Sequence, residues 1–234
     1  MESTLTRLDR RARLFAAAMA AVAGYVDGIG FLTSGGYFVS FMSGNSTRLG
    51  VGLFRHAPEA ALAASLVAAF VAGVLAGSSL RRLVRRRPEA AILTALTLTL
   101  ALCGWLVGRG PPKTVALLLA AAMGAENTLF AEAGEVRFGL TYMTGALVKI
   151  GKGLAAALFG EARSGWTPHL LLWLSLVAGA TLGATAYDRL GATAIWAAAA
   201  VVALLMPLSL TIFPPNGTGD AAAPAPGSEV DVRR

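Results

Sequence analysis

Charge is scarce in this sequence of 234 residues. Only 14% of them are Asp, Glu, Lys or Arg, whereas 56% are hydrophobic and the mean hydropathy is +0.64. Soluble domains carry roughly 25% charged residues, so this composition excludes soluble enzyme folds. The apolar runs are about 20 residues long, enough to cross a hydrocarbon core about 30 Å thick. Because an unpaired backbone is costly in lipid and the runs are rich in Ala and Leu, we expect an all-α polytopic membrane protein.

Cysteine is nearly absent too. Cys103 is the single cysteine and lies within an apolar run, which excludes a disulfide framework and a thiolate metal cluster. His56 and His169 lack the spacing of a metal-binding pair. The common nucleophile, zinc-hydrolase and nucleotide-binding motifs are missing. The sequence therefore predicts no cofactor, no metal site and no enzyme activity, and an intramembrane hydrolase stays an unsupported alternative.

Basic residues outnumber acidic ones, 20 to 13, which gives a net charge of +7. They lie at the ends of apolar runs and form no basic face with interleaved aromatic residues, so nucleic acid is not an expected partner. Membrane topology explains their placement better, and the predicted partner is the lipid bilayer.

An internal repeat organises the chain. Residues 40–53 align without gaps with residues 141–154, and both flanks extend the match, residues 24–27 with 124–127 and residues 71–77 with 177–183. The identical pairs of the central block are Met42/Met143, Gly44/Gly145, Gly50/Gly151, Gly52/Gly153 and Leu53/Leu154. The chain is thus predicted to contain two membrane repeats, about 14–108 and 113–213. A basic N-terminus, 1–13, precedes them, and a disordered tail, 214–234, follows.

Each repeat is predicted to hold one long span, one short glycine-interrupted segment and two further spans. The predicted segments are 14–33, 36–54, 59–80 and 89–108 in the first repeat, and 113–131, 138–159, 167–187 and 192–213 in the second. Whether the short segments, 36–54 and 138–159, cross the membrane or re-enter is left open.

The distribution of Lys and Arg arbitrates the topology, because cytoplasmic loops carry the excess. If the short segments do not cross, the arginine cluster at 81–87 lies on the same side as the basic N-terminus. This favours three transmembrane helices per repeat, a location in the bacterial inner (plasma) membrane, and cytoplasmic N- and C-termini. An odd number of spans per half makes the repeats inverted, which is a known plan of secondary transporters.

Two acidic residues are predicted to lie near the membrane midplane. Asp27 and Glu126 each fall about 13 residues into the first span of their repeat, and we expect the two carboxylates to be related by the pseudo-two-fold axis. Ionisable residues inside a membrane are functional candidates because burying them is costly. The structural alternative is an internal ion pair, Asp27 with Arg48 and Glu126 with Lys149.

The short segments combine glycines with hydroxyl and amide groups. Gly44 and Gly145 permit either unwound backbone or close helix approach, and a helix that begins after such a break aims its positive end at a cavity. This favours an anionic or strongly polar solute, while tight packing of small residues is the alternative. The candidate solute-binding residues are Asp27, Ser43, Gly44, Asn45, Thr47, Arg48, Glu126, Asn127, Thr144, Gly145 and Lys149.

Glycine pairs spaced four apart form small strips for close helix contact. The pairs are Gly24/Gly28, Gly73/Gly77, Gly104/Gly108 and Gly179/Gly183. Spacing alone does not say whether the strips are used internally or in a homo-oligomer.

A spaced motif in both repeats resembles the YoaK-like family of bacterial multi-pass membrane proteins. It consists of residues 23–31, Gly35-Gly36, Phe38 and residues 41–45 in the first repeat, and residues 124–127 and 143–145 in the second. The similarity covers about residues 14–213. The resemblance implies location and fold, and since the family has no assigned function it implies no catalytic residue and no substrate.

These observations support two hypotheses of different classes. The first is a secondary transporter or channel for an unknown small polar solute, with a proton carried by Asp27 or Glu126. The second is a non-transporting membrane assembly or interaction protein that uses its glycine strips to bind a partner.

Overall fold

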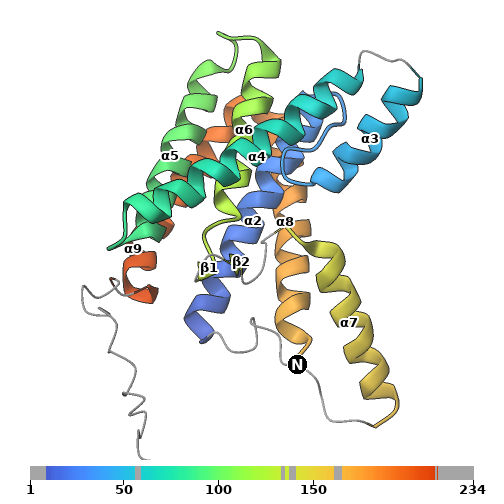
Figure 1. The fold of residues 1–234 in the computed structure, drawn as a ribbon, viewed down its shortest axis with the longest axis vertical. Coiled ribbons are helices and arrows are strands. Elements are labelled where there is room, and N and C mark those ends of the chain that lie inside the picture. Colours follow the sequence, from blue (N-terminus) through green and yellow to red (C-terminus); the bar gives the residue numbers. More distant parts are fainter. Residues whose placement is uncertain are drawn as a thin grey trace, which may run out of the picture.

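The computed structural model describes residues 9–55, 59–132, 135–136, 141–160, 165–213 and 215. These residues form helices and one pair of two-residue strands (Figure 1). The helices are α2 (Arg10–Thr33), α3 (Met42–Phe54), α4 (Glu59–Leu83), α5 (Pro88–Leu106), α6 (Pro112–Glu126), α7 (Met143–Leu158), α8 (Thr167–Leu190), the 3₁₀ turn η1 (Gly191–Ala194) and α9 (Ile195–Ile212). The antiparallel strands β1 (Ala131–Glu132) and β2 (Glu135–Val136) follow α6. The predicted helical fold is confirmed, and the strands were not predicted.

Both predicted terminal segments lie largely outside the described residues. Of the basic N-terminus, 1–13, residues 1–8 are not described, and of the C-terminal tail, 214–234, residue 215 alone is described.

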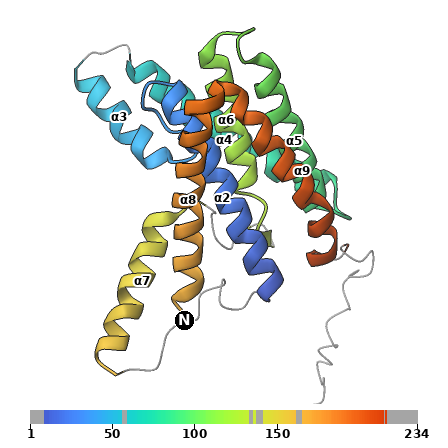
Figure 2. The ribbon, with the colours of Figure 1, turned by 180° about the vertical axis from the view of Figure 1, so that it is seen from behind.

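Four helical stretches of the described chain are long and apolar enough to cross a membrane. Three are α2, α4 and α5, and the fourth covers 46 residues, Thr167–Ile212. The chain reverses at η1, so this last stretch contains two helices, α8 with 24 residues and α9 with 18 (Figures 1 and 2). Each of the two is about as long as the hydrocarbon core is thick.

α3 and α7 are shorter than a hydrocarbon core of about 30 Å is thick, and so is α6 with 15 residues. α3 has 13 residues and α7 has 16, about 20 and 24 Å at a rise of 1.5 Å per residue. Both helices begin at about mid-height, α3 packed on α4 and α7 on α8, and run toward opposite ends of the molecule (Figures 1 and 2). The described parts of both short segments thus extend from the middle of the bundle toward one of its ends.

Local sequence explains several helix ends. Pro88, Pro112 and Pro168 lie in the first turns of α5, α6 and α8, where the missing N–H is not needed. Gly191, with φ of 61°, ends α8 in a backbone conformation that other residues rarely adopt.

α6 ends earlier than the predicted span 113–131. After Glu126 the side chains turn back onto the helix: Asn127 Nδ2 donates to the Met123 carbonyl (2.9 Å) and Thr128 Oγ1 to the Ala125 carbonyl (2.7 Å). Such bonds compete with the helical ladder, and residues 127–130 form turns.

Glycines bring the long helices into backbone contact inside the molecule. α2 packs along α8 and α4 packs along α6. A Cβ atom on Gly24 of α2 would overlap the carbonyl oxygen of Leu176 in α8, and one on Gly124 of α6 would overlap that of Phe70 in α4. Gly179 and Gly73 make the reciprocal contacts.

The reciprocal contacts repeat the same geometry from the other helix. A Cβ atom on Gly179 would overlap the Ala21 carbonyl oxygen, and one on Gly73 would overlap the Ala121 carbonyl oxygen. Three of the four predicted strips are thus used internally, and in the fourth Gly104 lies against the ring of Trp196.

Helix contacts in one half have counterparts in the other. α3 packs on α4 as α7 packs on α8, α9 packs on α2 as α5 packs on α6, and α5 and α9 pack on each other. α2 and α6 run in opposite directions, as do α4 and α8 (Figures 1 and 2). α2 is the most enclosed of the long helices, with 61% of its apolar window buried against 28–33% for the other candidate spans.

Candidate functional site

The chain between α2 and α3 is held in place by Asp27. Gly35 and Gly36, with φ of 76° and 94°, turn the chain back after α2. The Asp27 carboxylate oxygen Oδ1 then accepts hydrogen bonds from the backbone N–H groups of Val39 (2.7 Å) and Ser40 (2.8 Å). Asp27 therefore fixes the segment that leads into α3.

Asn45 holds the same segment from the other side. Its side chain is fully buried, its Oδ1 accepts from the Phe38 N–H (3.0 Å), and its Nδ2 donates to the Phe38 carbonyl (2.6 Å). Both polar atoms of the Asn45 side chain thus form hydrogen bonds with the backbone of Phe38.

The second half uses Asn127 where the first uses Asp27. Its Oδ1 accepts from the Thr141 hydroxyl (3.2 Å) and, more weakly, from the Thr141 N–H (3.5 Å). Thr141 is the repeat counterpart of Ser40. The structural counterpart of Asp27 is therefore the neutral amide of Asn127. The predicted symmetry of the two carboxylates, Asp27 and Glu126, is not found.

A cavity of about 470 Å³ lies between the starts of α3 and α7. Its walls come from the matching ends of the two repeat blocks and from one residue of α4. The lining residues are Ser40, Phe41, Met42, Ser43, Phe70, Thr141, Tyr142, Met143, Thr144 and Gly145. Of the predicted site residues, Ser43, Thr144 and Gly145 thus line one cavity although they come from opposite halves.

Both short helices point their N-terminal ends at this cavity. The first-turn amides of an α-helix have no intrahelical acceptor, and neither Phe41 nor Tyr142 caps its helix with a side chain. Each N-terminus carries a partial positive charge. Two such ends, with the hydroxyl groups of Ser43 and Thr144 beside them, form an arrangement suited to an anion.

Gly44 and Gly145 lie within the first turns and do not break the helices, which begin at Met42 and Met143. A Cβ atom on Gly44 would lie 2.8 Å from the rings of Phe38 and Phe41, so this glycine serves close approach. At Gly145 nothing lies within 4 Å, which keeps that wall of the cavity open.

The remaining predicted residues of the short helices point away from the cavity lining. Thr47, Arg48 and Lys149 are exposed, and the Arg48 guanidinium lies over the Tyr37 ring, 4.8 Å from its centroid. Thr47 donates to the Ser43 carbonyl within α3 (3.1 Å). Among the described residues neither ion pair of the structural alternative, Asp27 with Arg48 and Glu126 with Lys149, is formed.

Glu126 is the last residue of α6 and is fully buried. Neither of its carboxyl oxygens has a hydrogen-bond partner in the described part of the chain. An ionised carboxylate buried without a partner is strongly disfavoured, so this environment fits the neutral acid. Glu126 directly precedes Asn127, whose side chain holds the cavity residue Thr141.

Sequence reasoning missed seven lining residues. They are Ser40, Phe41, Met42, Phe70, Thr141, Tyr142 and Met143. All except Phe70 belong to the aligned blocks 40–53 and 141–154, so the repeat itself was the signal that could have found them.

Two comparisons with known proteins match most of the chain. The model of the family described as "Protein of unknown function (DUF1275)" matches residues 15–208. The UPF0700 transmembrane protein RA0705 of Rhizobium meliloti (strain 1021) is 36% identical over 190 residues, which cover 81% of this chain and 82% of that protein. No solved structure matches the chain.

Proposed function

The chain belongs to the DUF1275 family of proteins of unknown function, and from its geometry we propose that it is a membrane transporter or channel for a small anionic or strongly polar solute. The observation that carries the proposal is the cavity of about 470 Å³ between the starts of α3 and α7. Its volume lies within the range of small-molecule sites, roughly 300–1,000 Å³.

The two halves act in this proposal as inverted repeats that enclose the solute at their interface. Support comes from the matched contacts, Gly24 with Leu176 and Gly124 with Phe70, and from the opposite directions of α2 and α6 (Figure 1). Paired half-helices that meet at a cavity between repeats are typical of secondary transporters.

The orientation follows from the basic residues. The N-terminal end of α2 and the connection between α4 and α5, which carries the arginine cluster at 81–87, lie at the end of the bundle opposite the α5–α6 connection (Figures 1 and 2). The excess of Lys and Arg on cytoplasmic loops supports placing this end, with both termini, in the cytoplasm of a bacterial cell.

We favour an anion as the solute because the cavity walls carry hydrogen-bond donors. The first turns of α3 and α7 contribute backbone N–H groups, and Ser43 and Thr144 contribute hydroxyl groups. An oxyanion accepts such hydrogen bonds without needing a full positive charge in the membrane.

Glu126 is the group that couples transport to a proton. Its buried carboxyl is stable when neutral, and losing the proton requires that water or a cation reach it. Because Asn127 is its neighbour in the chain, a movement that opens Glu126 to water also moves the support of Thr141 at the cavity wall. Asp27, by contrast, positions the loop.

Uptake by purified protein in proteoliposomes tests this function. We expect at least one of the membrane-impermeant anions sulfate, phosphate and succinate to accumulate under an inward proton gradient. Thr144→Trp, which fills the cavity, is expected to abolish uptake. Glu126→Gln is expected to retain anion exchange and to lose the response to the gradient, whereas the exposed Glu59→Gln serves as the matched control and behaves like the wild type.

Two results would contradict the proposal. One is that none of the three anions moves in the wild type. The other is that Thr144→Trp, shown to be folded by an unchanged thermal transition, transports as fast as the wild type.

A further inference from the structure

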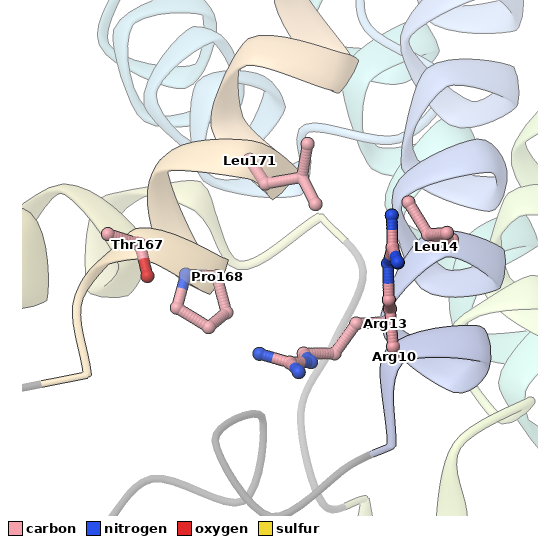
Figure 3. A pocket seen from close by; sticks show the side chains of 6 residues that line it. All are labelled: Arg10, Arg13, Leu14, Thr167, Pro168 and Leu171. Atoms are coloured by element: carbon pink, nitrogen blue, oxygen red, sulfur yellow. The ribbon is translucent and has the colours of Figure 1, made fainter.

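A second cavity lies where α2 and α8 begin. It measures about 310 Å³ and is lined from α2 by Arg10, Arg13 and Leu14, and from α8 by Thr167, Pro168 and Leu171. Figure 3 shows the arginines and Leu14 on one side and the three residues of α8 facing them, with one guanidinium group extending toward Pro168. The cavity is far along the helices from the α3–α7 cavity, with which it shares no lining residue.

The cavity contains an excess of positive charge without a described counterion. The Arg13 Nε atom is buried and has no hydrogen-bond partner in the described part of the chain. Neither Arg10 nor Arg13 forms an ion pair with a described acidic residue. The nearest acid along the chain, Asp9, is engaged in capping α2, where its Oδ1 accepts from the Ala12 N–H (2.7 Å).

The helix ends add to this positive potential. α2 and α8 pack along each other and both begin at this end of the bundle, so their N-termini lie on the same side (Figures 1 and 2). Trp166, which precedes α8, forms no side-chain cap. Both helices are long and apolar enough to cross a membrane, and a helix that does so has its first turn near the lipid phosphate groups.

The second repeat places its cations differently at the matching end. At the repeat positions that match Arg10 and Arg13 the sequence has Gly110 and Lys113. The neighbouring cation Arg109 lies over the Trp105 ring, 5.6 Å from its centroid.

We propose that this cavity binds an anionic phosphate group, that of a lipid headgroup, between Arg10 and Arg13. The apolar side chains Leu14, Pro168 and Leu171, which form much of the remaining wall, suit the glycerol and upper acyl carbons of a lipid. Arginine pairs with phosphate through parallel N–H donors, and the buried Arg13 Nε is such a donor.

Native mass spectrometry of the detergent-solubilised full chain tests the site. The double variant Arg10→Gln/Arg13→Gln is compared with the wild type and with Arg11→Gln, whose arginine is exposed and does not line the cavity. Binding of phosphatidylglycerol is expected to weaken roughly fivefold per arginine, hence more than tenfold in the double variant. Arg11→Gln is expected to bind like the wild type.

The source of the phosphate group is decided in a parallel arm. Inorganic phosphate is titrated against the same three proteins, with zwitterionic phosphatidylcholine as a further lipid. Preference for phosphatidylglycerol over both identifies a lipid site, and arginine-dependent binding of inorganic phosphate alone identifies a site for the soluble anion. The proposal is overturned if the double variant binds phosphatidylglycerol as tightly as Arg11→Gln does, and likewise binds inorganic phosphate as tightly. Both variants must keep the wild-type thermal transition for this comparison.

Discussion

The side chains that hold the residues before α3 and α7 show which property of Asp27 matters for the structure. Asp27 accepts hydrogen bonds from the N–H groups of Val39 and Ser40, and Asn127 accepts from Thr141 at the matching place. The second half does this with a neutral amide, so an oxygen acceptor at this position is required and a negative charge is not.

Replacing Asp27 tests this distinction. Asp27→Asn keeps an acceptor oxygen, so we expect a loss of at most about 1 kcal/mol in the free energy of unfolding. Asp27→Ala leaves two N–H groups without an acceptor, and about 2–3 kcal/mol should be lost. Thermal unfolding in detergent measures both, with Ser65→Ala, which removes an exposed hydroxyl, as control. If Asp27→Asn is as unstable as Asp27→Ala, the charge itself holds the loop.

The sequence identified the important polar residues at this scale but not their partners. Asp27 and Asn45 stand out because polar groups are rare in an apolar chain. Their partners are backbone N–H and carbonyl groups of the irregular segment 38–40, and no periodicity describes such a segment. The alternative ion pair of Asp27 with Arg48 is not formed, because backbone groups bond to Asp27 and the Arg48 guanidinium lies over the Tyr37 ring.

At the scale of helices, glycine decides how closely the bundle packs. The glycine pairs spaced four apart were predicted to form contact strips, and the structure assigns three of them to the α2–α8 and α4–α6 contacts. Spacing could not make this assignment because it describes one helix face and says nothing about what covers it.

Gly124→Ala is expected to force α6 away from α4. The added methyl group would overlap the Phe70 carbonyl oxygen, and a backbone cannot rotate aside as a side chain does. Overpacking of this kind costs about 1–3 kcal/mol or more. The matched control is Gly50→Ala in α3, where nothing lies within 4 Å and the change should raise stability by up to about 1 kcal/mol.

Thermal transitions of the two glycine variants give the comparison. Equal transitions for Gly124→Ala and Gly50→Ala would show that the α4–α6 contact is looser than described.

Helix boundaries were predicted best where charge or proline marks them. The structure starts α5 at Pro88 and α8 at Thr167, against predicted starts at 89 and 167. Differences of five or six residues fall at the starts of the short helices, where 36–54 and 138–159 were expected and α3 and α7 occupy 42–54 and 143–158, and at the end of α6, expected at 131 and found at 126. Asp27 holds Val39 and Ser40 before α3, and Asn127 holds Thr141 before α7, and a local pattern does not contain such contacts.

For the whole molecule, the predicted resemblance to a membrane family of unassigned function is confirmed. The repeat placed the two short segments at corresponding positions, and the structure brings their first turns to one cavity. The sequence did not predict the part of the cavity wall that α4 supplies. Phe70 of α4 lines the cavity and lies outside the aligned blocks 40–53 and 141–154.

Thiol labelling in intact cells tests most directly whether the two halves enclose an aqueous cavity. Ser43→Cys and Thr144→Cys are introduced singly into a Cys103→Ala background, with Leu75→Cys, 67% exposed on the outer surface of α4, as the lipid-facing control. We expect a water-soluble maleimide to modify the cysteines at 43 and 144 and to leave the one at 75 unmodified. Cysteines at 43 and 144 as unreactive as the control would contradict it.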